Sequence, residues 1–280
     1  MDISAKTKEL CRLYQIKPSR SKGQNFLINE AVYEEIIRSA DLKKTDEILE
    51  VGPGLGFLTA RLAAKSKKVS AVELDDKLAS FLQAGLSAQE VKNVQVINTD
   101  ILQFDEAQLG QPYKIVANLP YNISSFFLRK FLSTDFRPEL MVLLLQKEVA
   151  ERIVAWPGKM SLLAVSVQYY AQAEIIKIVP PGDFWPAPQV ESAIIKIKPN
   201  PDGLKYKNRA QVDAFFRLVK MGFSAKRKML KNNLAAGLKL EAKNLEEVLV
   251  FKGFNPKARA EDLSVADWQK LFAALAPFML

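Results

Sequence analysis

The chain of 280 residues has no histidine and a single cysteine, Cys11. Without imidazole, Ser-His-Asp and Cys-His catalysis are excluded, as is any metal site that needs a histidine ligand. One cysteine excludes a disulfide framework and favours a reducing compartment. The longest apolar runs, such as 140–145, fall far short of the ~20 residues that a membrane-spanning helix needs, and residues 1–20 lack the apolar core of a signal peptide. We therefore expect a cytoplasmic protein with no membrane partner and no metal.

Positive charge is abundant but unevenly distributed. Forty lysines and arginines against 31 acidic residues give a net charge of +9. Residues 201–280 hold 15 basic and 8 acidic side chains, and residues 1–28 hold six basic and two acidic side chains. The positive charge is therefore concentrated near both ends, and the middle of the chain is close to neutral. Charge alone fits either a solvated surface or a polyanionic partner bound through phosphate neutralisation.

Apolar periodicity predicts strands that alternate with helices through the first part of the chain. The expected strands are 47–51, 69–74, 94–98, 113–117, 140–146, 167–178 and 192–198, the last two as an antiparallel pair, and the expected helices are 30–40, 57–64, 78–86, 125–132, 147–156 and one after Gly158. This alternation indicates an α/β fold with a mostly parallel central sheet.

The turn-rich stretch 199–203 then precedes four expected helices, 212–221, 226–236, 245–251 and 265–275. We expect two domains, 1–200 and an all-helical 201–280.

A glycine-rich loop, GPGLG, follows the first of these strands and begins at Gly52. Glycines such as Gly54 allow a sharp turn and a close approach of the backbone to a ligand, and the helix that follows offers free N–H groups. The spacing G-x-G-x-G differs from the G-x-G-x-x-G of dinucleotide-binding proteins, which disfavours a nicotinamide cofactor.

Acidic residues end the next two predicted strands. Glu73 lies twenty-one residues beyond Gly52, where a carboxylate can accept both hydroxyls of a ribose. Asp100 follows the third strand and could accept a bond from an adenine amino group, with Ile101 against the ring. Because ligands of open α/β sheets bind at the carboxyl ends of the strands, we expect these residues to converge on one crevice.

The fourth strand ends in Asn118, Leu119, Pro120 and Tyr121. An exocyclic adenine amine is a poor nucleophile because its lone pair is delocalised into the ring. Acceptors that bind both amino hydrogens localise that pair, and the side-chain carbonyl of Asn118 and the main-chain carbonyl of Leu119 can do so. Pro120 shapes the turn that aims them, and Tyr121 offers a ring to stack on the base and to face the developing positive charge.

With these motifs the sequence resembles the class I, Rossmann-like methyltransferases that use S-adenosyl-L-methionine. More narrowly, it resembles the bacterial small-subunit (16S) rRNA adenine-N6,N6-dimethyltransferases, and the resemblance covers nearly the whole chain. The segment 23–27, GQNFL, matches the N-terminal motif of the family, and 184–193, FWPAPQVESA, matches its late motif F-x-P-x-P-x-V apart from Ala187.

The resemblance implies particular roles and partners. It places Asn25, Leu27, Gly52, Gly54, Glu73, Asp100, Ile101 and Asn118 around the cofactor, and Phe184 against the face of the target base opposite Tyr121. It further implies that two adjacent adenosines in the 3′-terminal hairpin of 16S rRNA each receive two methyl groups, that the partner is a precursor of the small ribosomal subunit, and that the enzyme has a role in ribosome biogenesis. The basic helical tail with Lys226, Arg227 and Lys228 is then expected to bind rRNA phosphates. We expect a monomer.

Alternatives remain at this point. The family that methylates large-subunit rRNA shares the catalytic motifs, although the basic tail and the late proline motif favour the small-subunit interpretation. A DNA adenine methyltransferase would share the cofactor pocket, but such enzymes usually carry a different tetrapeptide and a target-recognition domain. A non-enzymatic nucleic-acid-binding relative would have lost function at the motif, whereas here the motif is intact.

Overall fold

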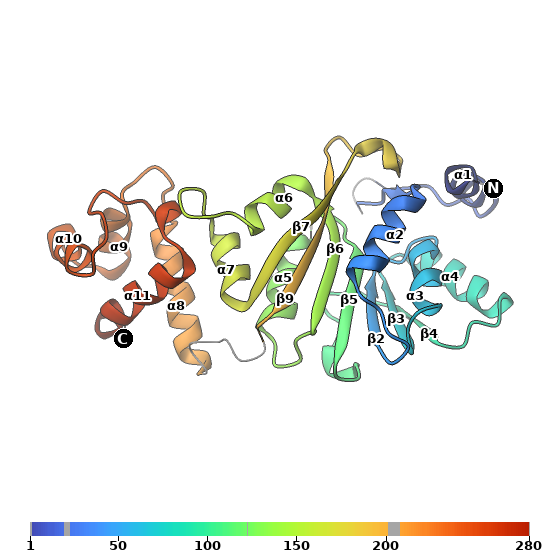
Figure 1. Cartoon of the computed structure of the whole chain (residues 1–280), viewed down its shortest axis with the longest axis horizontal. Coiled ribbons are helices and arrows are strands. Elements are labelled where there is room, and N and C mark those ends of the chain that lie inside the picture. Colours follow the sequence, from blue (N-terminus) through green and yellow to red (C-terminus); the bar gives the residue numbers. More distant parts are fainter. Residues whose placement is uncertain (1, 20–22, 122, 201–207, 280) are drawn as a thin grey trace. The chain divides into compact units, whose positions relative to one another are not determined.

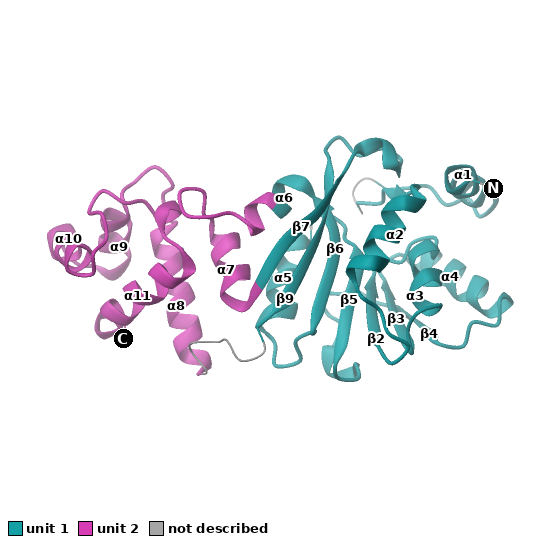
Figure 2. Cartoon of the chain, in the orientation of Figure 1, with its two compact units in different colours: residues 1–150, 172–201 teal, residues 151–171, 202–280 magenta. Residues whose placement is uncertain are grey.

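The computed structural model describes residues 2–19, 23–121, 123–200 and 208–279 (Figure 1). Residues 201–203 of the predicted linker therefore lie outside the described residues. The chain divides into two compact units, one of residues 1–150 and 172–201 and the other of residues 151–171 and 202–280 (Figure 2).

Unit 1 is built on a seven-stranded sheet with the order β4-β3-β2-β5-β6-β9-β7. The first five strands in this order run parallel to one another, and β9 pairs antiparallel with β6. The α/β class and the mostly parallel sheet are thereby confirmed. The strands of the sheet are β2 (Glu47–Val51), β3 (Lys68–Glu73), β4 (Val94–Asn98), β5 (Tyr113–Asn118), β6 (Leu140–Gln146), β7 (Ala171–Val179) and β9 (Ser192–Pro199).

The strands at the centre of this sheet are buried along most of their length because helices cover both faces. Six of the seven residues of β6 are buried, as are four of the five in β2, whereas every residue of β4 at the edge of the sheet is partly or fully exposed. The covering helices are α2 (Glu30–Ser39), α3 (Phe57–Ala63), α4 (Asp76–Ala88) and α5 (Ser124–Ser133), and α6 (Lys147–Ile153) follows β6 directly (Figure 1).

The basic N-terminal segment belongs to unit 1. Its helix α1 (Ile3–Leu13) buries Cys11, which belongs to one apolar cluster with Leu55 and Leu78. Two short strands that the sequence did not predict, β1 (Phe26–Leu27) and β8 (Phe184–Trp185), then pair antiparallel, with Leu27 opposite Phe184. The N-terminal and late proline motifs are therefore neighbours in space.

Unit 2 is helical, as predicted, but it begins earlier than the expected boundary at residue 200. Its helices are α7 (Leu162–Tyr170), α8 (Arg209–Gly222), α9 (Leu230–Leu238), α10 (Ala242–Phe251) and α11 (Val265–Leu275). Residues 151–171 join this unit because Tyr169 stacks on Phe215 at 5.0 Å between ring centroids, and because the amides of Gly158 and Met160 donate to the Glu261 carbonyl at 2.8 and 3.1 Å.

The two largest errors in the predicted element boundaries lie at the start of a strand and at the start of a helix. The strand expected from 167 begins at Ala171, because Val167–Tyr170 complete helix α7 and pack their aromatic rings inside unit 2. The helix expected from Lys226 begins at Leu230, so the three basic residues lie in the turn before it. Among the described residues, no helix has both the length and the apolar character needed to cross a bilayer.

Candidate active site

A cavity of about 340 Å³ opens in unit 1 where the parallel strands end. It is lined by the residues that follow β2, β3, β4 and β5, which is the edge where ligands of open α/β sheets bind. Nine of the predicted site residues line it, namely Asn25, Leu27, Gly52, Gly54, Glu73, Asp100, Ile101, Asn118 and Pro120. The convergence expected from the strand order is present in the structure.

The glycine loop forms one wall of this cavity. Gly54 adopts a φ of +55°, in the left-handed region, and a Cβ at this position would lie 3.2 Å from a ring carbon of Phe26. A side chain here would therefore be strained and would press on the N-terminal motif. The Gly54 amide donates to Glu73 Oε2 at 3.1 Å, which joins the loop to the end of β3.

Backbone amides hold the two strand-end carboxylates in place. Glu73 Oε1 accepts from the amide of Asp75 at 2.9 Å while Oε2 accepts from Gly54, and burial raises the pKa of this carboxyl although both amides act in the opposite direction. Asp100 Oδ1 accepts from the amide of Leu102 at 2.8 Å. Each carboxylate oxygen can accept more than one hydrogen bond, so these carboxylates are positioned and still able to bind a ligand.

The turn after β5 carries the candidate catalytic residues. Asn118 Nδ2 donates to the main-chain carbonyl of Asn25 at 3.3 Å, which fixes the amide and leaves its oxygen as the acceptor. The Leu119 amide donates to the Leu144 carbonyl at 3.0 Å, so the turn is continuous with the sheet. Leu119 itself is buried and does not line the cavity.

Tyr121 is held by a residue that sequence reasoning did not single out. Its hydroxyl lies 2.7 Å from Oγ of Ser192, the first residue of β9, and burial raises the pKa of the tyrosine. Ser192 is fully buried. The hydrogen bond sets the direction of the ring, and Ser192 was recognisable only as part of the late family motif.

The N-terminal motif forms another wall of the cavity. A Cβ on Gly23, whose φ is +65°, would lie 3.2 Å from Cβ of Pro120, so this glycine permits the motif to pack on the catalytic turn. The segment 23–27 thus contacts Pro120, Asn118 and Gly54 in succession. It links the glycine loop to the catalytic turn.

Phe184 does not line the cavity. The side chain is only 3% exposed and belongs to the main apolar core of unit 1, because β8 turns it inward opposite Leu27. Its role of stacking on the target base stays a prediction, as does that of Tyr121, which does not line the cavity either.

Glu50 is a cavity residue whose importance the sequence did not reveal. It is 1% exposed near the end of β2, and no described residue makes a hydrogen bond to either carboxylate oxygen or to the hydroxyl of Thr59 close by. Burial raises the pKa of Glu50 to about 8, and the negative charge of Glu73 adds to this rise. The Thr59 hydroxyl, which is close by although it forms no hydrogen bond of normal geometry, lowers the pKa. An unpaired buried carboxyl is costly unless it is protonated or meets a ligand. The available signal was an acid between the apolar residues Leu49 and Val51 of β2.

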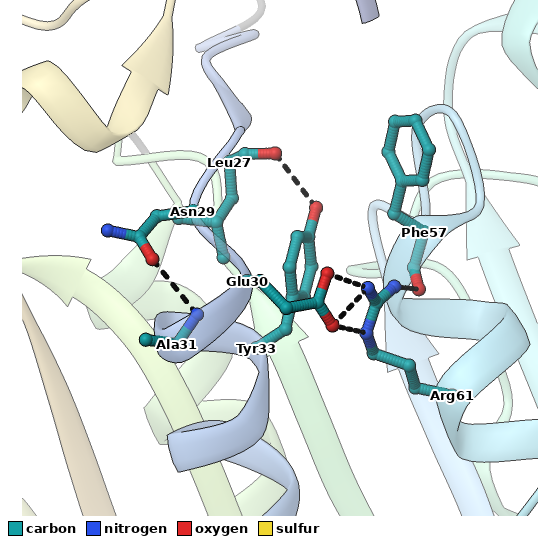
Figure 3. A network of polar contacts seen from close by, with 7 residues as sticks. All are labelled: Leu27, Asn29, Glu30, Ala31, Tyr33, Phe57 and Arg61. Atoms are coloured by element: carbon teal, nitrogen blue, oxygen red, sulfur yellow. Dashed lines mark hydrogen bonds and ion pairs between the residues drawn. The ribbon is translucent and has the colours of Figure 1, made fainter. Parts of the chain in front are cut away.

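A polar network fixes the wall of the cavity formed by α2 and α3 (Figure 3). The Arg61 guanidinium donates to Glu30 Oε1 at 3.1 Å and to the Phe57 carbonyl at 2.6 Å, and it lies 4.5 Å from the centre of the Tyr33 ring. The Tyr33 hydroxyl in turn donates to the Leu27 carbonyl at 2.9 Å. The network therefore connects α2, α3 and the N-terminal motif.

Comparison with known proteins agrees with this geometry. A family model described as "Ribosomal RNA adenine dimethylase" matches residues 16–277 of the chain. The chain belongs to the ribosomal RNA adenine dimethylase family. Relatives in this family include a "Ribosomal RNA small subunit methyltransferase A" from Dehalococcoides mccartyi, 43% identical over 96% of this chain and 92% of its own length, and one from Alkaliphilus metalliredigens, 37% identical over 97% and 96%.

Solved structures extend the family likeness to three dimensions. A dimethyladenosine transferase from Plasmodium falciparum superposes with a TM-score of 0.78 at 26% identity over 90% of this chain and 98% of that one. A 23S rRNA methyltransferase, ErmE, superposes with a TM-score of 0.72 at 26% identity over 90% and 100%. The fold of this dimethylase-family chain is thus the methyltransferase fold predicted from its sequence.

The basic residues predicted to bind RNA lie in unit 2. Lys226, Arg227 and Lys228 are exposed in the turn between α8 and α9. The buried side chain of Asn233 shapes this turn, donating to the carbonyls of Gly222 at 2.6 Å and Ala225 at 3.0 Å. The three positive charges are therefore presented from a braced turn.

Proposed function

We propose that this chain transfers methyl groups from S-adenosyl-L-methionine to the N6 amino groups of two adjacent adenosines in the 3′-terminal hairpin loop of 16S rRNA, two to each base. The observation that carries the proposal is that Asn118 and Pro120, from the turn after β5, line one cavity together with the strand-end carboxylates in a dimethylase-family chain. The rRNA small-subunit methyltransferases among its relatives favour the small subunit.

The residues of the cavity fit S-adenosyl-L-methionine, which supplies an electrophilic methyl group on a positively charged sulfur when it is bound. Glu73 would accept from the ribose hydroxyls, and Asp100 from the adenine amino group with Ile101 against the ring. The glycine loop would accommodate the chain between nucleoside and amino acid. Glu50, otherwise unpaired, would balance the positive charge of the ligand.

At the catalytic turn the protein acts by orientation. Asn118 Oδ1 and the Leu119 carbonyl accept the two hydrogens of the target amine, which directs the nitrogen lone pair toward the methyl group. Tyr121, fixed by Ser192, stacks on the base. Once one methyl is present a single hydrogen remains, so the second transfer keeps one of these two acceptor bonds. The protein thereby lowers the entropic part of the barrier.

The direct test is to incubate the protein with labelled S-adenosyl-L-methionine and either 16S rRNA, 23S rRNA or DNA, and to analyse the products by mass spectrometry. The proposal requires dimethyladenosine at two neighbouring positions of 16S rRNA. Label in DNA or only in 23S rRNA would contradict it. The same measurement on precursor particles shows whether free RNA or the assembling subunit is the better substrate.

Ser192→Ala is expected to lower kcat about tenfold, because the freed tyrosine ring samples unproductive orientations. The affinity for the cofactor should be unchanged, since Ser192 does not line the cavity. Tyr121→Phe is the matched variant, because it removes the same hydrogen bond from the other side. If the double variant loses no more than either single variant, the two groups act through this bond; additive losses would disprove the coupling.

Reversing the charges of Lys226, Arg227 and Lys228 to glutamate is expected to weaken RNA binding and to reduce the slope of log affinity against log salt by about two to three. Methylation should recover at high RNA concentration. Lys243→Glu, a single reversal on α10, serves as a control for a general change of charge. An RNA affinity equal to that of the wild type in the triple variant would show that this turn does not contact the RNA.

A further inference from the structure

Trp156 is the most exposed of the tryptophans described in this chain. It is 63% exposed in the segment between α6 and α7, whereas Trp268 is fully buried and Trp185 packs against an apolar cluster. Lys159 lies beside it, with Nζ 5.4 Å from the centre of the indole ring. An exposed indole with a cation beside its ring offers a face on which a planar ligand can stack.

The segment that carries Trp156 is fixed on both sides. Gln168 Nε2 on α7 donates to the carbonyls of Ile153 and Ala155 at 2.8 and 2.7 Å. The amides of Gly158 and Met160 donate to the Glu261 carbonyl, and the Lys159 amide closes a turn on the Trp156 carbonyl at 2.9 Å. The flanking residues Ala155 and Met160 are buried. The indole is therefore displayed on a braced loop, so little conformational entropy is lost when it binds.

The same loop lies close to the basic turn of unit 2. Leu230 lies just beyond the basic turn Lys226–Lys228. Its amide donates to the Ala258 carbonyl at 2.8 Å. Three residues beyond Ala258, the Glu261 carbonyl binds the Trp156 loop. Three residues of chain span at most about 11 Å, so the loop and the basic turn lie within a few nucleotide lengths of each other. The exposed Arg259 lies on the segment that joins them.

We propose that Trp156 is a stacking platform for an unpaired base of the RNA, with Lys159 and the basic turn holding the phosphates on either side. This rests on the proposed rRNA substrate and goes beyond it, since it assigns a contact outside the methyl-transfer cavity. An aromatic face with neighbouring cations is what single-stranded nucleic acid binds, because every base has a face to stack and every linkage a negative charge. A protein partner is the competing occupant.

The test compares the affinities of four proteins, wild type, Trp156→Ala, Trp156→Leu and Trp156→Phe, for the 3′-terminal hairpin of 16S rRNA and for a fully paired duplex of the same length. The alanine and leucine variants should bind the hairpin about 5- to 150-fold more weakly and the duplex as the wild type does, and phenylalanine should restore most of the affinity. Binding of the hairpin should also quench tryptophan emission in the wild type but not in Trp156→Phe.

The outcomes separate this proposal from the proposed function. Methyl transfer to the hairpin by the wild type establishes that the cavity is functional. An unchanged cofactor affinity in every variant establishes that the fold is intact. If transfer occurs and Trp156→Ala binds the hairpin like the wild type, the stacking platform is wrong and the proposed function stands. Loss of affinity only for protein-containing particles would assign the surface to a protein. Absence of transfer by the wild type both to the hairpin and to precursor particles would overturn the proposed function itself.

Discussion

Replacing Asn118 by alanine is expected to lower kcat for methyl transfer by about a hundred- to a thousandfold. In the proposed mechanism the side-chain oxygen accepts one of the two amine hydrogens, and without it the nitrogen lone pair would no longer be held toward the methyl group. Because the loss arises in the transition state, the Kd for S-adenosyl-L-methionine should change much less than kcat. Single-turnover rates with calorimetry on the same preparations measure both quantities.

Asn118→Asp is the informative companion to the alanine variant. It keeps the acceptor and removes the donor that binds the Asn25 carbonyl at 3.3 Å. We expect an intermediate rate, because the acceptor remains but its orientation is no longer fixed. An alanine variant that turns over within threefold of the wild type would remove Asn118 from the mechanism.

Glu50→Gln is expected to stabilise the protein and to weaken cofactor binding. In the folded chain the pKa of Glu50 is about 8, against an ordinary value of 4.5. Between these values the folded chain keeps a proton that the unfolded chain releases, so the contribution of Glu50 to stability falls as the pH rises through this window. At pH 8.5 the variant should therefore be more stable by on the order of a few kcal/mol, measured by urea unfolding without cofactor.

The affinity for the cofactor should increase as the pH rises, whereas the stability of the free protein decreases. If ionised Glu50 balances the positive charge of the ligand, each pH unit below about 8 costs up to tenfold in affinity, because Glu50 must first lose its proton. Glutamine should abolish this slope. Glu47→Gln is the matched control, since Glu47 is on the same strand but outside the cavity, and its bond with Lys67 lowers its pKa. Equal pH slopes for wild type and Glu50→Gln would refute the assignment.

The sequence predicted the sheet and the convergence of its strand ends because both follow from apolar patterning. In a parallel sheet, residues that follow successive strands must meet at one edge, and thus Glu73, Asp100 and Asn118 line one cavity although they are far apart in the chain. Boundaries were less predictable where tertiary packing decides. Tyr169 and Tyr170 complete a helix because Phe215 and Phe216 receive their rings, a contact between residues more than forty positions apart.

Sequence reasoning did not reveal the importance of Ser192 and Glu50, because it depends on long-range contacts that no local pattern encodes. Ser192 matters because its hydroxyl meets Tyr121, seventy-one residues earlier. Glu50 matters because every neighbouring element leaves it without a hydrogen-bond partner among the described residues. Phe184 could be assigned a role only through the family resemblance, because the two-residue pairing of β8 with β1, which buries its side chain, follows from no local pattern.

The strand order also constrains how the chain can be made. β7 is synthesised before β9, yet β9 lies between it and β6 in the sheet. A nascent chain that ends before residue 192 has no sheet neighbour for β7, and Tyr121 still lacks the hydroxyl that fixes it. Because chains emerge from the ribosome N-terminus first, the last sheet strand to be translated both completes the sheet and fixes the tyrosine. A prematurely released fragment would contain the whole cofactor cavity but would be unable to orient a base beside it.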